Sequence, residues 1–486
     1  MTEKTAQPDA SQGRARWLVA SVAFAAFLCM LNTHTINIAL PVIAQHFQVD
    51  TGMVARVTLA YLMTMTCLLL VFGKLDDQLG LKRLFISGYG LFTAGSLLSG
   101  IAPSLGILIL GRAVQGIGAS MLLTTGTAII ARHVPPNRRG WGFGIQGAFS
   151  AAGAMLGAPL GGLITQYAGW QWVFLANVPV CILAAVLAKW AIPVEKPSAP
   201  ARQVLATFDW PGAGLSFAGI FLLLSGLNMG RKLGWASPAI LTCFAAGVLL
   251  LLLFMVRERK CAAPLLNLAL FRDRAFTCAN LAGMAAFMVM TGSNFLMPFY
   301  LARYKHQSAA ATGFVVMLFS AVFLLASPIA GRLSDRIHPA RLCAAGMACA
   351  IAACIILQLT LQMPGLMPAL VFLGLFGFGF AMFASPNNNQ VMGLAPPAMA
   401  GTAASLFRTA GTFGSASGLA LFEALFSMAP PRAAAAADPA AMLVSGFRAA
   451  YGFGALLCLA ALVLSLAAGR LANWQTIQAH RKEIKP

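Results

Sequence analysis

Long apolar runs separated by short polar segments dominate the chain. Each run holds about 20 residues or more, the length that an α-helix needs to cross the ~30 Å hydrocarbon core of a bilayer. A helix in a soluble protein is shorter and keeps a polar face. The pattern predicts fourteen membrane-spanning helices, at residues 17–46, 53–73, 83–102, 105–131, 140–166, 171–190, 210–228, 238–256, 274–301, 309–331, 340–361, 366–391, 399–428 and 443–469.

The composition supports a protein of the lipid bilayer. Of the 486 residues, 59% are hydrophobic and only 9% are charged, whereas a soluble domain carries about 25% charged residues. A net charge of +20 would suggest nucleic-acid binding in a soluble protein. Here the basic residues lie mainly between apolar runs, without a basic stripe of interleaved aromatics, so we expect no binding to nucleic acid.

The lysine and arginine residues predict the orientation of the chain. An even number of spans places both termini on one side of the membrane. The termini and the loops on their side hold most of the basic residues, and such residues concentrate in cytoplasmic loops. We therefore expect both termini in the cytoplasm. The first apolar run continues well past Trp17 without a cleavage pattern, which argues against a cleavable signal peptide.

Three short patterns occur twice in the chain at nearly the same spacing. The pairs are 73–83 with 331–341 (offset 258), 37–41 with 294–298 (offset 257) and 153–157 with 414–418 (offset 261). Each pair takes the same place in the order of helices, which indicates a duplicated six-helix unit. Transporters built from such repeats bind their substrate at the interface between the repeats.

The repeat divides the chain into five expected segments. They are a cytoplasmic N-terminal tail at 1–16, a six-helix bundle at 17–190, a linker with two extra transmembrane helices at 191–260, a second six-helix bundle at 261–469 and a cytoplasmic C-terminal tail at 470–486.

Four segments resemble signatures of the major facilitator superfamily. They are Leu31–Pro41 in the first helix, Gly73–Leu84 in the following cytoplasmic loop, Leu110–Gly118 in the fourth helix and the antiporter pattern Gly153–Gly162 in the fifth. With fourteen spans, the chain is similar to the fourteen-helix drug:proton antiporter branch. The resemblance implies an all-α major facilitator fold, multidrug efflux by antiport and a role in antibiotic resistance.

Charged residues near the ends of two equivalent helices are candidates for a gate. Asp77 ends the second predicted helix, where its carboxylate can meet a helix N-terminus or the basic pair Lys82 and Arg83. Asp335 repeats this position in the second half and is followed by Arg336. Such a charge contact would hold one conformation and break in the other. The alternative is a charge that only anchors the end of a helix.

Small residues form a stripe along the fifth predicted helix. Gly153, Gly157 and Gly161 recur every four residues, and Pro159 stands one place later than in the antiporter signature. This spacing lets two helix backbones approach closely. The stripe is either a pivot or seal between the two halves or an ordinary packing surface, and both roles are compatible.

Few ionisable residues lie inside the spans, so each is a candidate site. Arg112 and Arg408 need a partner or water, because a charge inside the membrane is costly. Glu423 is the only carboxylate within a predicted span that lies far from a cytoplasmic end, and it is either a proton or cation site or a residue of the outer rim. The resemblance places an aspartate where this chain has Asn32, which cannot titrate. His34 could replace that group, or it could be a packing residue. The candidates for proton coupling are Glu423, His34 and Arg112.

Four consecutive amides at 387–390 lie inside the twelfth predicted helix. Amides at membrane depth must line a polar cavity or pair with other helices. With amides in other helices they predict a cavity rich in neutral hydrogen-bonding groups. The candidate cavity residues are Asn32, His34, Asn37, Gln115, Gln146, Asn294, Asn387, Asn388 and Arg408.

These features predict a monomeric secondary transporter of the bacterial cytoplasmic membrane that exports small amphipathic compounds in exchange for protons. A second hypothesis follows from Arg112 and Arg408, since a positive cavity would favour an anionic or neutral metabolite, antibiotic or lipid. A third class, a sensor or membrane enzyme, is disfavoured because the repeat is retained and the sequence holds no catalytic cluster. No Walker A or metal-ligand pattern occurs, so we expect no cofactor or metal.

Overall fold

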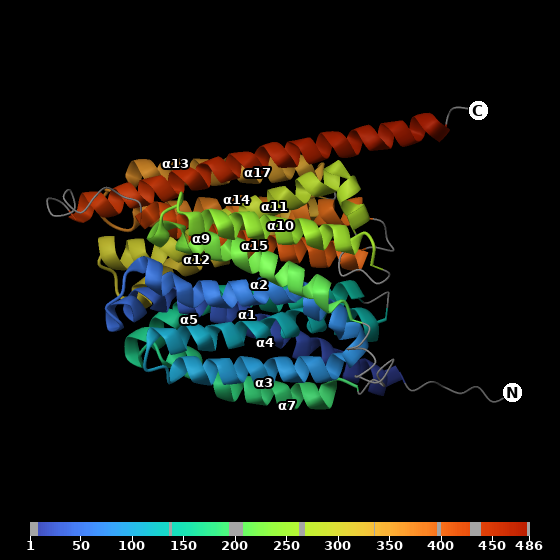
Figure 1. Ribbon diagram of the computed structural model, residues 1–486, viewed down its shortest axis with the longest axis horizontal. Helices are drawn as coiled ribbons and strands as arrows, with labels where there is room; N and C mark the ends of the chain where they lie inside the picture. The colour runs from blue at the N-terminus through green and yellow to red at the C-terminus, as the bar shows by residue number, and fades with distance from the viewer. Residues whose placement is uncertain are drawn as a thin grey trace.

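The computed structural model shows a bundle of long, roughly parallel helices (Figure 1). It describes residues 8–135, 139–193, 208–261, 268–334, 336–395, 400–427 and 439–483, and no strand occurs among them. The helices are α1 (Pro8–His46), α2 (Thr51–Leu79), α3 (Leu81–Gly100), α4 (Leu105–His133), α5 (Arg139–Tyr167), α6 (Trp172–Leu175), α7 (Asn177–Ala191), α9 (Trp210–Leu233), α10 (Pro238–Glu258), η2 (Leu268–Arg272), α11 (Arg274–Phe299), η3 (Tyr300–Tyr304), α12 (Ala309–Ser334), α13 (Pro339–Thr360), α14 (Met367–Leu394), α15 (Ala400–Ser427) and α17 (Pro439–Glu483).

Polar residues in the short connections set where several helices begin. Asp50 precedes α2 and accepts a hydrogen bond from the backbone N–H of Met53 at 2.7 Å. Asp273 precedes α11 and accepts one from the N–H of Ala275 at 2.7 Å. Such caps satisfy N–H groups that have no partner inside the helix. Near the other end of α11, Pro298 is followed by the π-helical turn η3.

The predicted all-α membrane fold is confirmed. Within the described residues, twelve helices are long and apolar enough to span a bilayer. The other two expected spans, 83–102 and 399–428, correspond to α3 and α15, which are also long helices. Both are less apolar: α3 is rich in glycine and serine, and α15 carries Arg408 and Glu423. The expected span 171–190 is interrupted, because α6 ends before Ala176 and α7 begins after it.

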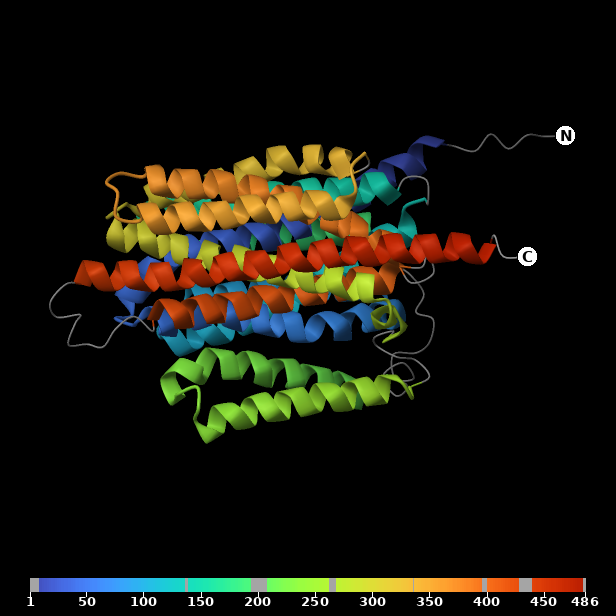
Figure 2. The same ribbon diagram turned by 90° about the horizontal axis from the view of Figure 1, so that it is seen from above.

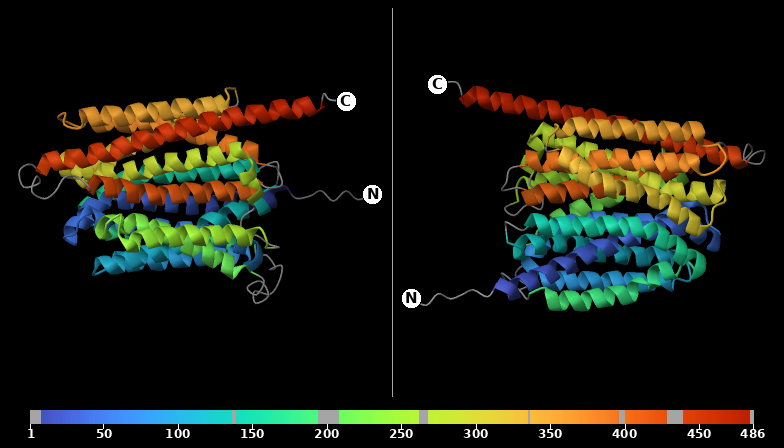
Figure 3. Two further views of the ribbon diagram at one scale, coloured as in Figure 1. Left: turned by 45° about the horizontal axis from the view of Figure 1, so that its top comes forward. Right: turned by 180° about the vertical axis from the view of Figure 1, so that it is seen from behind.

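The described chain starts and finishes at the same end of the bundle. Figures 1 and 3 show that α1 begins at the end where α17 stops, and that α17 extends beyond the other helices there. We call this the terminal end, and the other the distal end. Helices α1–α7 (the N-half) lie on one side and α11–α17 (the C-half) on the other. The residue boundaries of the five expected segments, and the cytoplasmic position of the termini, stay predictions.

The pair α9 and α10 stands beside the two halves rather than between them (Figure 2). Helix α9 packs against α2 of the N-half and α15 of the C-half, while α10 packs mainly on α9. Leu249, Leu252 and Val256 on α10 are about half exposed, as expected for side chains that face lipid. At the terminal end, Arg257 binds Asp209 at 2.7 Å and joins the two helices.

Several contacts join the N-half to the C-half at the distal end. A methyl group on Gly162 of α5 would lie 3.0 Å from Ala310 Cα of α12, so the two backbones touch there. The side chain of Gln166 accepts a hydrogen bond from the N–H of Ala310 at 3.0 Å. Arg303 donates to the Thr51 hydroxyl at 3.0 Å. The distal end is therefore closed by both small residues and polar bonds.

Candidate functional site

Arg112 of α4 is the centre of a buried polar network in the N-half. Its side chain is fully buried. One guanidinium nitrogen, Nη1, donates to Asn32 Oδ1 of α1 at 2.6 Å and also to Gln115 Oε1. The Nε group donates to the carbonyl oxygen of Val57 in α2 at 3.2 Å. Three helices of one half are thereby joined through a single cation.

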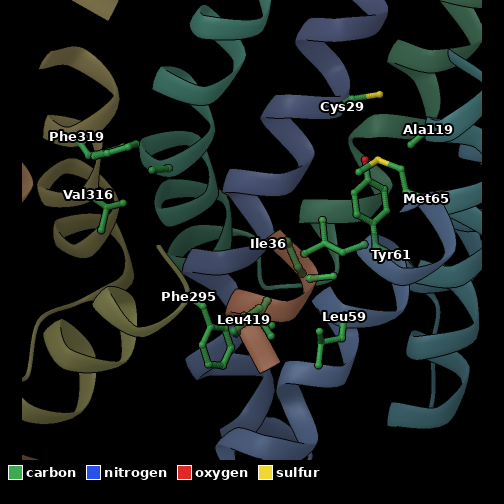
Figure 4. Close-up of a cluster of buried hydrophobic side chains, with 14 of the residues drawn as sticks. Cys29, Ile36, Leu59, Tyr61, Met65, Ala119, Phe295, Val316, Phe319 and Leu419 are labelled. Atoms are coloured by element: carbon green, nitrogen blue, oxygen red, sulfur yellow. The ribbon is translucent and has the colours of Figure 1, made fainter. Parts of the chain in front are cut away.

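Aromatic and hydroxyl groups complete the surroundings of Arg112. Its guanidinium carbon lies 4.2 Å from the centre of the Tyr61 ring, a distance typical of a cation–π contact. Figure 4 shows the hydroxyl end of the Tyr61 ring near Met65, on the side toward Cys29. Gln115 donates from Nε2 to the Ser96 hydroxyl at 2.6 Å, which extends the network to α3. The Nη2 group of Arg112 has no hydrogen-bond partner within the described residues.

Every partner of Arg112 in the described part of the chain is neutral. The contacts are with amides, a carbonyl and aromatic rings, and none is with a carboxylate. Asn32 occupies the place where an ion pair with Arg112 would form. A buried cation usually has a counter-ion. The centre of the N-half therefore keeps a positive charge that the protein solvates only with dipoles.

The glycine stripe of α5 faces α1 in the same half. A methyl group on Gly157 would lie 2.8 Å from His34 Cβ, and one on Gly161 would lie 2.6 Å from the carbonyl oxygen of Thr35. Thr35 also donates its hydroxyl to the Gly157 carbonyl at 3.0 Å. Gly153 lies against the same helix, at the backbone of residues 27–31. On the other face of α5, Pro159 and its neighbour approach Gly313 of α12. Helix α5 therefore links one half to the other.

The remaining ionisable candidates lie on α15. Arg408 donates to the carbonyl oxygen of Leu123 in α4 at 3.2 Å, a bond between the halves. Glu423 is buried and accepts a hydrogen bond from the Ser427 hydroxyl at 2.7 Å. Their helix meets the N-half through apolar side chains: Figure 4 shows Leu419 next to Ile36. The proposed roles of both residues in coupling and binding stay predictions.

The predicted amide candidates fall into separate groups. Asn32 and Gln115 contact Arg112, whereas Asn37 accepts a bond from Thr58 at 3.5 Å. Gln146 and Asn294 are buried on α5 and α11. In α14, Asn387 is buried and Asn388 is exposed.

Two further buried amides that lack some of their hydrogen-bond partners were not among the predicted candidates. Asn280 of α11 and Gln390 of α14 are 4% and 7% exposed, and each has side-chain atoms without a partner in the described residues. Gln390 belongs to the amide run that the sequence analysis noted. A comparison of the two repeats position by position would have found Asn280, because the equivalent residue of the first repeat is apolar.

The gating candidates are only partly visible. The side chain of Asp77 and the whole of Asp335 lie outside the described residues. Lys82 donates to the carbonyl oxygen of Ile192 at 2.6 Å, which joins the start of α3 to the end of α7. Arg83 and Arg336 are exposed. A charge contact that opens and closes at this end stays a prediction.

Comparisons with known proteins support the fold and the family. The model of the Major Facilitator Superfamily matches residues 22–208 and 210–419. A riboflavin transporter, RibZ of Clostridioides difficile, is 32% identical over 416 residues, which cover 85% of this chain and 88% of the relative. The multidrug resistance protein Stp of Mycobacterium tuberculosis is 27% identical over 82% of this chain and 74% of its own length. The methylenomycin A resistance protein of Bacillus subtilis is 28% identical over 70% of this chain and 72% of its own.

Solved structures resemble the fold at low sequence identity. An inward-facing, unoccupied bacterial homologue of the human lysosomal transporter Spinster aligns with a TM-score of 0.69 at 14% identity, covering 96% of this chain and 98% of its own. The peptide transporter POT aligns with a TM-score of 0.67 at 17% identity, covering 93% and 95%.

Proposed function

We propose that this chain, which belongs to the Major Facilitator Superfamily and is a multi-pass membrane transporter, exports small amphipathic compounds by alternating access. Export is coupled to protons that move inward across a bacterial cytoplasmic membrane. The chain acts as a monomer, and both termini lie in the cytoplasm. Relatives named as multidrug and methylenomycin resistance proteins support export of toxic compounds.

The contacts between the halves support a transport cycle of this kind. Two polar contacts lie at the distal end, where Arg303 binds Thr51 and Gln166 binds the backbone of α12, while a third, from Arg408 to the Leu123 carbonyl, joins the halves away from that end. With the termini in the cytoplasm, the distal end faces the outside and is closed. This arrangement is the one that an exporter needs when it takes up its substrate from the cytoplasm. The closed distal end is the observation on which the proposed direction rests.

A second candidate is export of a neutral or anionic metabolite. It is favoured by the buried Arg112, whose partners are all neutral, and by Asn32, which leaves the guanidinium without a counter-ion. A positive site repels the lipophilic cations that multidrug exporters often carry and attracts anions or strong dipoles. The relative named as a riboflavin transporter supports a polar, uncharged substrate.

Purified protein in proteoliposomes tests the two candidates. We would impose a pH gradient and follow uptake into inside-out vesicles of a lipophilic cation, a matched organic anion and riboflavin. The first candidate predicts cation transport that collapses with the gradient and in Glu423→Gln. The second predicts transport of riboflavin or the anion without the cation. Transport that ignores the pH gradient would contradict proton coupling in either case.

A further inference from the structure

Three buried amides in the C-half share one region near the terminal end. Asn280 of α11, and Asn387 and Gln390 of α14, are 4%, 0% and 7% exposed. Five of their side-chain atoms have no hydrogen-bond partner in the described residues: Asn280 Oδ1, both polar atoms of Asn387 and both of Gln390. Buried polar groups in folded proteins almost always have a partner. A concentration of unpartnered atoms on two adjacent helices therefore needs an explanation.

The geometry brings the amides to one face. A methyl group on Gly283 of α11 would lie 3.0 Å from Asn387 Nδ2, so the Asn387 amide lies directly against α11. Asn280 is one turn before Gly283, and Gln390 is one turn after Asn387, so each lies on the same face of its helix. A methyl group on Gly283 would also lie 2.9 Å from the Phe407 ring of α15. One wall of the region is therefore aromatic.

The internal repeat provides a comparison within the same chain. A methyl group on Gly88 would lie 3.2 Å from the Gly118 carbonyl, and one on Gly346 would lie 2.5 Å from the Gly379 carbonyl. Gly88 and Gly346 are 258 residues apart in the sequence, and Gly118 and Gly379 are 261 residues apart. The repeat offsets thus hold in three dimensions for α3 and α4 against α13 and α14.

The offsets of the repeat place the three amides opposite apolar residues of the N-half. Asn280 corresponds to Ala23 at the offset of 257 that relates α1 to α11, and Asn387 and Gln390 correspond to Gly126 and Ile129 at the offset of 261. Ala23 and Ile129 are fully buried, and the neighbouring Val22 Cγ1 would lie 3.0 Å from a methyl group on Gly126. The fold therefore packs well with apolar residues at these places. The amides of the C-half serve a purpose other than holding the helices together.

The chemistry of the amides indicates the ligand. Each side chain offers both a donor nitrogen and an acceptor oxygen, and none is charged. A ligand that satisfies them carries donors and acceptors side by side, as a cyclic imide or ureide does. Phe407 stands 6.3 Å from Phe287, which stands 5.7 Å from Phe380, so aromatic rings continue from the amides into the C-half. Such rings favour a flat ligand.

We propose that Asn280, Asn387 and Gln390, with Phe407 beside them, form a subsite for a neutral, planar heterocycle with an imide or ureide edge. This inference rests on the proposed transport function and names the substrate class for it. The subsite lies about 10 Å from the terminal end of α14, since Asn387 is seven residues from the last residue of that helix. A substrate that enters from the terminal side would meet it early.

Flavin fluorescence measures binding to the purified full-length protein. The probes are riboflavin, whose ring has an imide edge, and riboflavin methylated at the imide nitrogen, which lacks the donor. We expect the unmodified protein to bind riboflavin at least tenfold more tightly than the methylated compound. In Asn387→Leu that preference disappears and riboflavin binding weakens about tenfold. Gln358→Leu, which removes an amide from α13, is the matched control. It should leave both the riboflavin affinity and the preference over the methylated compound unchanged.

A second variant separates a binding role from a structural one. Asn280→Ala combined with Gln390→Ile copies the N-half residues into the C-half. We expect this protein to unfold at the same or a higher temperature, because unpartnered amides are removed, and yet to lose the preference for riboflavin. A lower melting temperature would show that the amides are structural and would overturn the inference, as would an unchanged preference in both variants.

The outcomes also distinguish this inference from the proposed function. If the protein exports other compounds but does not discriminate between the two flavins, the subsite is wrong and the exporter stands. If it discriminates between them but transports nothing under a pH gradient, the subsite stands and proton-coupled export is wrong.

Discussion

The substitution Asn32→Asp tests whether the lone charge of Arg112 selects the substrate. Asn32 Oδ1 already lies 2.6 Å from the guanidinium, so a carboxylate of the same shape would form an ion pair without rearrangement. At an effective dielectric constant near 20, charges ~4 Å apart attract by about 4 kcal/mol. Burying the carboxylate costs several kcal/mol. The two terms largely cancel, and we expect little change in stability.

The effect on selectivity is larger, because the substitution neutralises the site. A unit charge about 8 Å from a charged substrate contributes about 2 kcal/mol at the same dielectric constant. Its loss should therefore change the affinity for a monovalent ion roughly thirtyfold, upward for a cation and downward for an anion. A neutral substrate should bind almost as before.

Competition assays on the purified protein measure this effect with a cation, an anion of similar size and a neutral compound. Asn32→Leu is the control: it removes the hydrogen bond without adding charge, so it should lower stability but leave the ratio of cation to anion affinity unchanged. If Asn32→Asp folds, binds the neutral compound normally and leaves that ratio unchanged, the reasoning about Arg112 is refuted.

Three further predictions concern other parts of the molecule. Glu423→Gln should abolish transport driven by the pH gradient while substrate binding remains, and gradient-driven transport retained in proteoliposomes would remove Glu423 from the coupling mechanism. Gly162→Leu places a side chain against Ala309 and Ala310. It should hold the distal end apart and lower transport at least tenfold, measurable together with increased labelling of a cysteine engineered nearby; normal transport would show that this contact is not a gate. The Arg257 guanidinium lowers the pKa of Asp209 below its ordinary value of 3.8, so the pair stabilises the protein above that value and the stabilisation is lost as pH falls through the lowered pKa. The difference in melting temperature between the protein and Asp209→Asn should be small, because solvent reaches the Arg257 side chain and screens the pair, and it should close as the pH is lowered from about 6 to about 3; a difference that widens would contradict this sign.

The sequence was sufficient for the fold because the bilayer constrains it strongly. A helix must satisfy its own backbone in lipid, so the length of each apolar run predicts a span. The repeat was also visible, since nearly equal offsets related patterns far apart in the chain. The interruption at Ala176 was not predicted, although Asn177 and Pro179 follow it directly and Pro179 has no backbone N–H to donate to the carbonyl of Leu175.

The candidate site was predictable in kind but not in arrangement. Arg112 and Asn32 were both named, yet their direct bond depends on how α1 and α4 face each other, which the order of residues does not specify. Asn280 was missed because a single amide near a helix end is unremarkable in a sequence. Its meaning comes from Ala23, the residue that the first repeat places at the equivalent position.

Helix α9 has a mechanical consequence for a protein whose halves move. It packs against α2 of one half and α15 of the other, so any rocking of the halves must slide at least one of these contacts. The outer helix α10 presents mostly lipid-facing side chains, and the pair must displace lipid as it shifts (Figure 2). The extra pair thereby connects the cycle to the lateral pressure of the bilayer. Turnover should depend on the stiffness of the surrounding acyl chains more strongly than in a twelve-helix relative, where that seam meets lipid directly.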